Sequence, residues 1–139
     1  MNVDSIRDGI VIDHIAAGNG MKLYRLLGLE GLDVPVAMIT NAVSAKRGRK
    51  DIIKIDAEIP VNFDVIGYVD PGATVNVIRD GVLREKKTLE LPETLTGVIR
   101  CRNPRCITSA ERDLPDVFRL TDRKGQVYRC VYCEAKYEG

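Results

Sequence analysis

The sequence has almost no net charge, few aromatic residues and no long apolar run. Its 21 lysines and arginines nearly balance 20 aspartates and glutamates in a chain of 139 residues. This balance argues against a dedicated nucleic-acid or membrane-surface protein, because such proteins are usually basic overall. No apolar run approaches the roughly 18 residues that a transmembrane helix needs. The first residues also lack the basic-then-apolar order of a signal peptide, so we expect a cytoplasmic protein.

Cysteine is missing from the first 100 residues, and all four cysteines fall between Cys101 and Cys133. In the cytoplasm, cysteines are more often metal ligands than disulfide partners. The segment 91–97, which contains a proline and a glycine, is typical of a hinge. We therefore expect two domains, residues 1–93 and 94–139. The smaller domain is close to the size that needs a metal in order to fold.

The N-terminal domain alternates β-branched segments with amphipathic ones. The pattern predicts strands at 9–15, 34–43, 51–56, 74–78 and 82–89, and helices at 21–29 and 62–69. Asp80-Gly81 predicts a hairpin turn between the last two strands. The order β-α-β-β-α-β-β indicates an α+β fold, namely a ferredoxin-like sandwich of the βαββαβ type with two helices on one face of the sheet.

The cysteines form two close pairs, Cys101-x4-Cys106 and Cys130-x2-Cys133, separated by 23 residues. This spacing is typical of a tetrahedral four-thiolate zinc site. Four protein ligands leave no open coordination position, so we expect one structural Zn²⁺ per chain in a small β-rich domain. The alternative is a set of free or disulfide-paired thiols, which the expected compartment disfavours.

Acidic and basic residues are mixed between the two cysteine pairs, so they form no basic stripe. This mixture favours a surface that contacts another protein. The alternative is a zinc-ribbon nucleic-acid-binding protein, for which a basic face with aromatic side chains would be required. A stand-alone enzyme would need a nucleophile or an open metal position, and the sequence indicates neither.

His14 is the single histidine, and it follows Asp13 near the end of the first predicted strand. Neighbours on a regular strand point to opposite faces, so no Asp–His catalytic dyad is expected. A half-buried histidine beside an exposed aspartate and a ligand-binding role both remain open. Alternation also places Lys50, Ile52 and Lys54 on one face. That face is either solvated or a phosphate site built from lysine charges, and no glycine-rich phosphate loop accompanies it.

Together these motifs resemble the regulatory subunit of aspartate carbamoyltransferase, and the resemblance runs from about residue 3 to the end. It implies a non-catalytic subunit in pyrimidine biosynthesis that forms homodimers and bridges catalytic trimers in a hetero-dodecamer. It also implies an N-terminal domain that binds CTP and UTP as inhibitors and ATP as activator. The stretches that carry the resemblance are 9–15, 48–55, 73–76 and the four cysteines with Asn103 and Glu134.

The resemblance also implies roles for individual residues. Asp13 and Lys54 would hold the ribose hydroxyls of the nucleotide, and His14 and Lys86 would contact its phosphates. This role requires the first strand to end or twist at His14. The remaining implied residues are Asn76 and Lys50 at the same end of the pocket, the apolar walls Val3, Val11, Ile78 and Leu83, the zinc ligands Cys101, Cys106, Cys130 and Cys133, and the contacts to the catalytic chain, Asn103 and Glu134.

Overall fold

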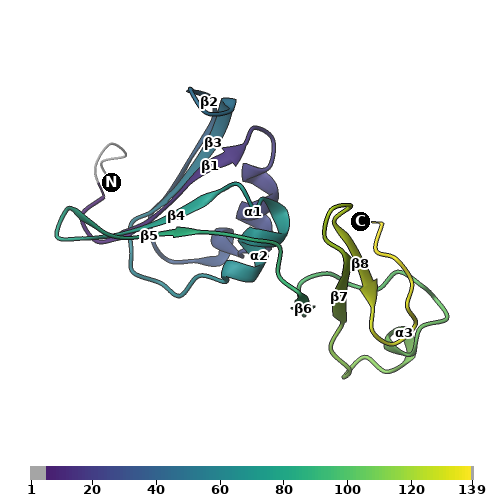
Figure 1. Cartoon of the computed structure of the whole chain (residues 1–139). Coiled ribbons are helices and arrows are strands. Elements are labelled where there is room, and N and C mark those ends of the chain that lie inside the picture. Colours follow the sequence, from purple (N-terminus) through teal and green to yellow (C-terminus); the bar gives the residue numbers. More distant parts are fainter. Residues whose placement is uncertain (1–5, 139) are drawn as a thin grey trace. The chain divides into compact units, whose positions relative to one another are not determined.

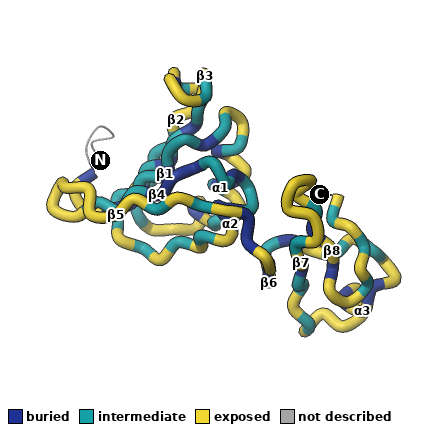
Figure 2. The backbone as a smooth tube through the Cα atoms, viewed as in Figure 1, coloured by how far each residue is buried: buried dark blue, intermediate teal, exposed yellow. Residues whose placement is uncertain are grey.

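The computed structural model describes residues 6–138, and the chain divides into two compact units, Met1–Glu90 and Leu91–Gly139 (Figure 1). The sequence placed the boundary slightly later, after residue 93. Each unit has buried residues of its own along its strands (Figure 2). None of the helices in the described part of the chain has both the length and the apolar character required to cross a bilayer.

The first unit is built on one antiparallel sheet of five strands. The strand order is β2-β3-β1-β4-β5, so the first four strands have the arrangement of a ferredoxin-like fold and β5 extends the sheet next to β4. This confirms the predicted fold class. The elements are β1 (Gly9–Ala16), α1 (Gly20–Leu26), the 3-10 helix η1 (Leu29–Gly31), β2 (Val36–Ser44), β3 (Gly48–Ile55), α2 (Phe63–Val69), β4 (Thr74–Arg79) and β5 (Val82–Thr88).

Branched aliphatic residues form the core between the sheet and the helices. Ile12, Ile53 and Ile66 are fully buried, and Leu23 is the residue of α1 that joins them. The sequence predicted a longer buried helix over 21–29. The helix ends earlier because Gly28 adopts a left-handed φ of 67°, which breaks the helix. A helix of two turns presents few residues to the core, and Met21 consequently stays 43% exposed.

A side-chain cap begins α2, and the hairpin turn that the sequence predicts joins β4 to β5. The Asn62 side chain accepts hydrogen bonds from the backbone N–H groups of Asp64 and Val65, at 3.0 and 3.3 Å, and so begins α2. Asp80 and Gly81 both have positive φ, 54° and 72°, as a type I′ hairpin turn between β4 and β5 requires.

Three strands of this sheet carry β-bulges. In β1 and in β2 one extra residue is accommodated opposite β3, at Ile12/Ile15 and at Ile39/Ala42. In β5 one extra residue lies opposite Val77/Ile78 of β4. A bulge changes which residues of a strand share a face, so strict alternation does not hold along these strands.

The second unit is a three-stranded antiparallel sheet beside a short helix. Its core is formed by Leu95, Phe118 and Tyr128 from the three strands, with the Tyr128 hydroxyl donating to the backbone oxygen of Pro92 at 2.5 Å. The ring of Tyr137 packs edge-on against Phe118, with centroids 5.6 Å apart. The elements are β6 (Thr94–Thr96), α3 (Ile107–Ala110), β7 (Val117–Asp122) and β8 (Val127–Cys130).

Candidate metal centre and effector surface

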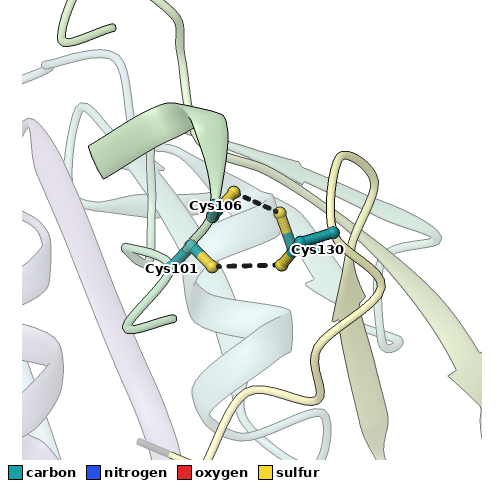
Figure 3. Close-up of side chains that lie close together, drawn as sticks. Cys101, Cys106 and Cys130 are labelled. Carbon is teal, nitrogen blue, oxygen red and sulfur yellow. Dashed lines mark hydrogen bonds between the residues drawn. The ribbon is translucent and has the colours of Figure 1, made fainter. Parts of the chain in front are cut away.

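The four cysteines of the second unit converge on one point. Their sulfur atoms all lie within 4.8 Å of one another. The Sγ atoms of Cys101 and Cys133 are 3.6 Å apart, and those of Cys106 and Cys130 are 3.8 Å apart. Figure 3 shows three of these side chains turned toward a common centre. Each pair sits at a turn: Cys106 N–H donates to Asn103, and Glu134 N–H donates to the carbonyl of Cys130.

The cluster has the dimensions of a tetrahedral zinc site. A Zn–S bond of about 2.3 Å in a regular tetrahedron separates the sulfur atoms by about 3.8 Å. The observed separations of 3.6 and 3.8 Å match this value. The donor set therefore fits one Zn²⁺ with four protein ligands, as the sequence predicts. A closed all-thiolate shell supports folding and leaves no position for a substrate.

Burial and neighbouring hydrogen-bond donors shift the pKa values of the cysteine thiols in the cluster. Burial raises the pKa of the Cys101 thiol to about 12. Burial acts in the same direction at Cys133, but the backbone N–H of Ala135 and the Asn103 side chain outweigh it and lower the pKa of Cys133 to about 7. Metal must therefore displace protons from the thiols when it binds. The Thr108 hydroxyl donates to Cys106 Sγ at 3.1 Å, so it orients this ligand.

The two residues that the resemblance assigned to partner contact lie beside the metal centre. Asn103 is half-buried and interacts with Cys133. Glu134 directly follows that cysteine, is exposed and has a left-handed φ of 64°. Asn103 therefore has a role in supporting the cluster, while the Glu134 side chain is open to solvent.

In the first unit, four residues form a row across the sheet. Register pairs place Lys54 of β3 beside Val11 of β1, Val11 beside Asn76 of β4, and Asn76 beside Lys86 of β5. Directly opposed residues on antiparallel strands point to the same side. The next row along the strands is Ile53, Ile12 and Val75, which is fully buried. The row from Lys54 to Lys86, which we call the effector row, thus lies on the outer face of the sheet.

Asp13 and Lys50 form an ion pair on the same face. Lys50 Nζ lies 2.9 Å from Asp13 Oδ1, and the side chains are only 17% and 22% exposed. Burial alone would raise the pKa of Asp13, but the hydrogen bond from Lys50, the backbone N–H of His14 and the two positive charges nearby outweigh it and lower that pKa below 3.8. Asp13 is therefore a stable anion at neutral pH.

The β1 bulge brings Asp13 and His14 to one side of the sheet. His14 has a left-handed φ of 58°. Its ring Nδ1 lies 3.2 Å from Thr74 Oγ1, and Thr74 is the register partner of Asp13. The expectation that the two side chains point to opposite faces is therefore wrong, because it assumed a regular strand. A non-glycine residue in this conformation costs about 1 kcal/mol or more and is frequent at ligand sites.

The centre of the effector row contains a polar atom without a partner. Asn76 Oδ1 is buried, and it accepts no hydrogen bond within the described part of the chain. A buried unsatisfied oxygen costs about 1–3 kcal/mol. A donor supplied by a bound molecule would remove this cost. Among the apolar walls implied by the resemblance, Ile78 lies two residues further along β4 than Asn76 and pairs with Leu83, and Val3 lies outside the described residues.

Two buried carboxylates that sequence reasoning missed hold the end of β1 in place. Asp51 accepts backbone hydrogen bonds from Gly18, Gly20 and Asn41 at 2.8–3.0 Å. Asp70 accepts from the backbone N–H of Ala16 at 2.6 Å and binds both terminal nitrogens of Arg47 at 3.0 and 3.2 Å. The aspartate directly before the apolar pair Ile52-Ile53 of β3 was the available signal for the first of them.

Comparison with known proteins covers both units. Residues 1–90 match the family model for the aspartate carbamoyltransferase regulatory chain, allosteric domain, and residues 93–139 match the model for its metal binding domain. A Clostridium botulinum aspartate carbamoyltransferase regulatory chain is 49% identical over 139 residues, which are 100% of this chain and 95% of the relative. Regulatory chains of Clostridium tetani and Bifidobacterium longum are 48% and 44% identical, with coverage of 99% and 96% of this chain and 96% of each relative.

Proposed function

Because the chain belongs to the family of aspartate carbamoyltransferase regulatory chains, with an allosteric and a metal-binding domain, we propose that its first unit binds nucleotide effectors on the outer face of the sheet. The family is the regulatory and not the catalytic chain. CTP and UTP act as inhibitors and ATP as activator in this proposal. The chain itself performs no chemistry, and the binding energy of the nucleotide changes the activity of a partner.

The observation that carries the proposal is the effector row together with the unsatisfied oxygen at its centre. Lys54 and Lys86 lie at the two ends of the row, and Asn76 Oδ1 lies between them without a donor. A triphosphate needs converging cations to offset its desolvation, and lysines supply them. The Asp13 carboxylate would be repelled by phosphates, so it suits the ribose hydroxyls. His14 would contact the phosphates from the β1 bulge.

Calorimetric titration of CTP, UTP and ATP into the full chain tests the proposal. Lys86→Ala should weaken all three triphosphates about tenfold, since it removes one charged contact. Lys87→Ala is the matched control, because Lys87 pairs with Val75 and lies 4.4 Å from the Phe63 ring on the opposite face. Lys54→Ala and Asp13→Ala should weaken nucleosides as well as triphosphates. Millimolar nucleotide without any heat of binding to the wild type contradicts the effector site.

We further propose that the chain assembles with the catalytic chain of aspartate carbamoyltransferase. The first unit forms the homodimer and the second unit, near Glu134 and Asn103, contacts the catalytic chain, so that regulatory dimers bridge catalytic trimers in a hetero-dodecamer. The names of the relatives support a catalytic partner. Co-expression of the chain with the catalytic chain of its own organism, followed by mass measurement of the purified complex, tests this arrangement. Two separate species in solution contradict it.

A further inference from the structure

One buried carboxylate joins three segments of the first unit. The Asp70 side chain, only 6% exposed, directly follows α2 and accepts the backbone N–H of Ala16, at the end of β1, at 2.6 Å. It also accepts the backbone N–H of Gly72, just before β4, at 3.0 Å. Both terminal nitrogens of Arg47, in the turn between β2 and β3, bind it at 3.0 and 3.2 Å. We call Asp70, Arg47 and Gly72 the aspartate clamp.

Two of the clamped segments carry His14 and its hydrogen-bond partner. Ala16 lies two residues after His14, and Gly72 lies two residues before Thr74, whose Oγ1 is 3.2 Å from the ring Nδ1 of His14. The left-handed φ of 58° at His14 is unfavourable for a residue with a side chain, and such a conformation persists only where the surroundings enforce it. The Asp70 carboxylate holds both strands beside this contact, and it therefore fixes where the β1 bulge and the imidazole lie.

The third segment, the turn between β2 and β3, leads into the residue that pairs with Asp13. Arg47 lies three residues before Lys50, whose Nζ is 2.9 Å from Asp13 Oδ1. A planar guanidinium that binds both oxygens of a carboxylate fixes the direction of approach as well as the distance. Arg47 consequently orients the turn against Asp70, and the beginning of β3 is held against the end of β1.

Gly72 leaves free the space that the Arg47 guanidinium occupies. A Cβ atom built on Gly72 would overlap Arg47 Nη2 and lie 2.9 Å from Arg47 Cζ. A side chain at position 72 therefore displaces the guanidinium from Asp70. Gly72 does not have a positive φ, so the backbone conformation does not require a glycine here. The missing side chain instead allows the close approach of Arg47.

We propose that the aspartate clamp is a positioning device for the effector site, an inference that rests on the proposed function. The clamp holds His14 and Lys50 in the arrangement that binds nucleotide, and none of its three residues contacts the nucleotide. Arg47 and Asp70 neutralise each other, so the clamp acts through geometry and not through added charge. When only a fraction of the molecules has the binding arrangement, the apparent dissociation constant rises by the inverse of that fraction.

Gly72→Ala tests the clamp, because it displaces the guanidinium without changing the charge of the chain. Calorimetric titration of CTP into the full chain should show about fivefold weaker binding, which corresponds to a binding-competent population of about one fifth. Arg47→Met should weaken CTP equally, and the double variant should be no weaker than either single variant, since both changes break the same contact. Gly31→Ala is the matched control. A Cβ atom there meets no other atom within 4 Å, so this variant should bind like the wild type.

The NMR chemical shifts of the His14 amide and Cα, recorded without nucleotide, separate positioning from a loss of stability. They report the left-handed backbone of His14, and in Gly72→Ala and Arg47→Met they should move toward the values of a regular strand. In Gly31→Ala they should stay in place. A lower unfolding temperature alone leaves these shifts unchanged, because the molecules that remain folded keep the conformation.

The outcomes separate the inference from the proposed function. If Gly72→Ala and Arg47→Met bind CTP like the wild type, the clamp is not a positioning device and the proposed function stands. Weaker binding with unchanged His14 shifts also overturns the inference, because the loss then has another cause. A wild-type chain that binds no CTP at millimolar concentration overturns both. Arg47→Met adds no atoms to the core, so it decides the question if Gly72→Ala does not fold.

Discussion

Asp13 is an anion that its neighbours keep charged against the effect of burial. Burial raises the pKa of Asp13. The Lys50 ammonium and the His14 backbone N–H lower it by more, so the pKa lies below its ordinary value. Removing the ammonium in Lys50→Met leaves the burial and deletes the attraction, so the pKa of Asp13 should rise. NMR titration of the Asp13 carboxyl carbon measures this. Lys46→Met removes an exposed lysine of the turn that precedes β3 and should leave the titration unchanged.

The lowered pKa of Asp13 also sets the sign of a pH effect on stability. A carboxyl with a lower pKa in the folded chain stabilises the fold above its ordinary value of 3.8 and loses that contribution as pH falls through the lower folded value. The difference in free energy of unfolding between wild type and Asp13→Asn should therefore be constant near neutral pH and shrink below pH 3.8. Urea unfolding of the first unit checks this. A difference that grows on acidification would show that the sign is wrong.

Cys130 belongs to the four-cysteine cluster and is only 1% exposed, and its replacement should release the metal. Cys130→Ser leaves three thiolates and a poorer oxygen ligand, so zinc content should fall from about one ion per chain to a small fraction. Metal analysis of freshly purified protein measures it. Wild-type protein without zinc would contradict both this prediction and the assignment of the site.

Thr108 offers a milder change at the same cluster. Thr108→Val deletes the hydroxyl that donates to Cys106 Sγ while keeping the volume of the side chain. Loss of such an outer hydrogen bond typically costs about 10–100-fold in metal affinity. Competition with a chromogenic chelator should show this weakening, whereas Ser109→Ala, whose hydroxyl donates to backbone oxygens, should retain the affinity of the wild type.

Among the elements, the turn between β2 and β3 is fixed to the end of α2 by the Arg47–Asp70 pair. Asp70 is 6% exposed and the pair has bidentate geometry. Arg47→Met leaves a buried carboxylate without its cation, so the free energy of unfolding should fall by about 2 kcal/mol. The exposed pair Arg79–Glu58 supplies the control, and Arg79→Met should cost less than about 0.5 kcal/mol. Equal losses in urea unfolding would contradict the argument.

Elements that are specified by adjacent residues were predictable from the sequence. The hairpin at Asp80-Gly81 depends on two residues that tolerate positive φ, and the zinc site depends on two short cysteine spacings. The bulge at His14 was not predictable, because it depends on how β1 pairs with β3 across the sheet. The buried hydrogen bonds of Asp51 and Asp70 were not predicted for the same reason, since their partners come from other segments of the chain.

At the scale of the whole molecule, each unit has its own core, and all four cysteines of the candidate metal centre belong to the second. A structural zinc site contributes about 10 kcal/mol of apparent binding free energy, and this energy is coupled to folding. Treatment with a mercurial should therefore unfold the second unit and detach the chain from its catalytic partner. The first unit should remain folded. Amide NMR resonances of Ile12 and Ile53 that persist after metal release would agree, and their collapse would show that the units fold as one.

The bulges determine which side chains of the first sheet share a face. In β1, Ile10 and Ile12 face the core on even positions, and Ile15 faces it on an odd one. In β5, the odd-numbered Leu83 pairs with Ile78, and the even-numbered Lys86 pairs with Asn76. Ile78 and Asn76 share one face of β4. Deleting one bulge residue, such as His14, would restore regular alternation and keep the later side chains on their present sides, because Ile15 would then follow Ile12 by two positions. Deleting a residue outside a bulge would instead turn every later side chain of that strand to the other face. Evolution can therefore shorten the loops of this fold, or a strand at its bulge, by one residue, but elsewhere in these strands only a change of two residues keeps the core side chains on the core face.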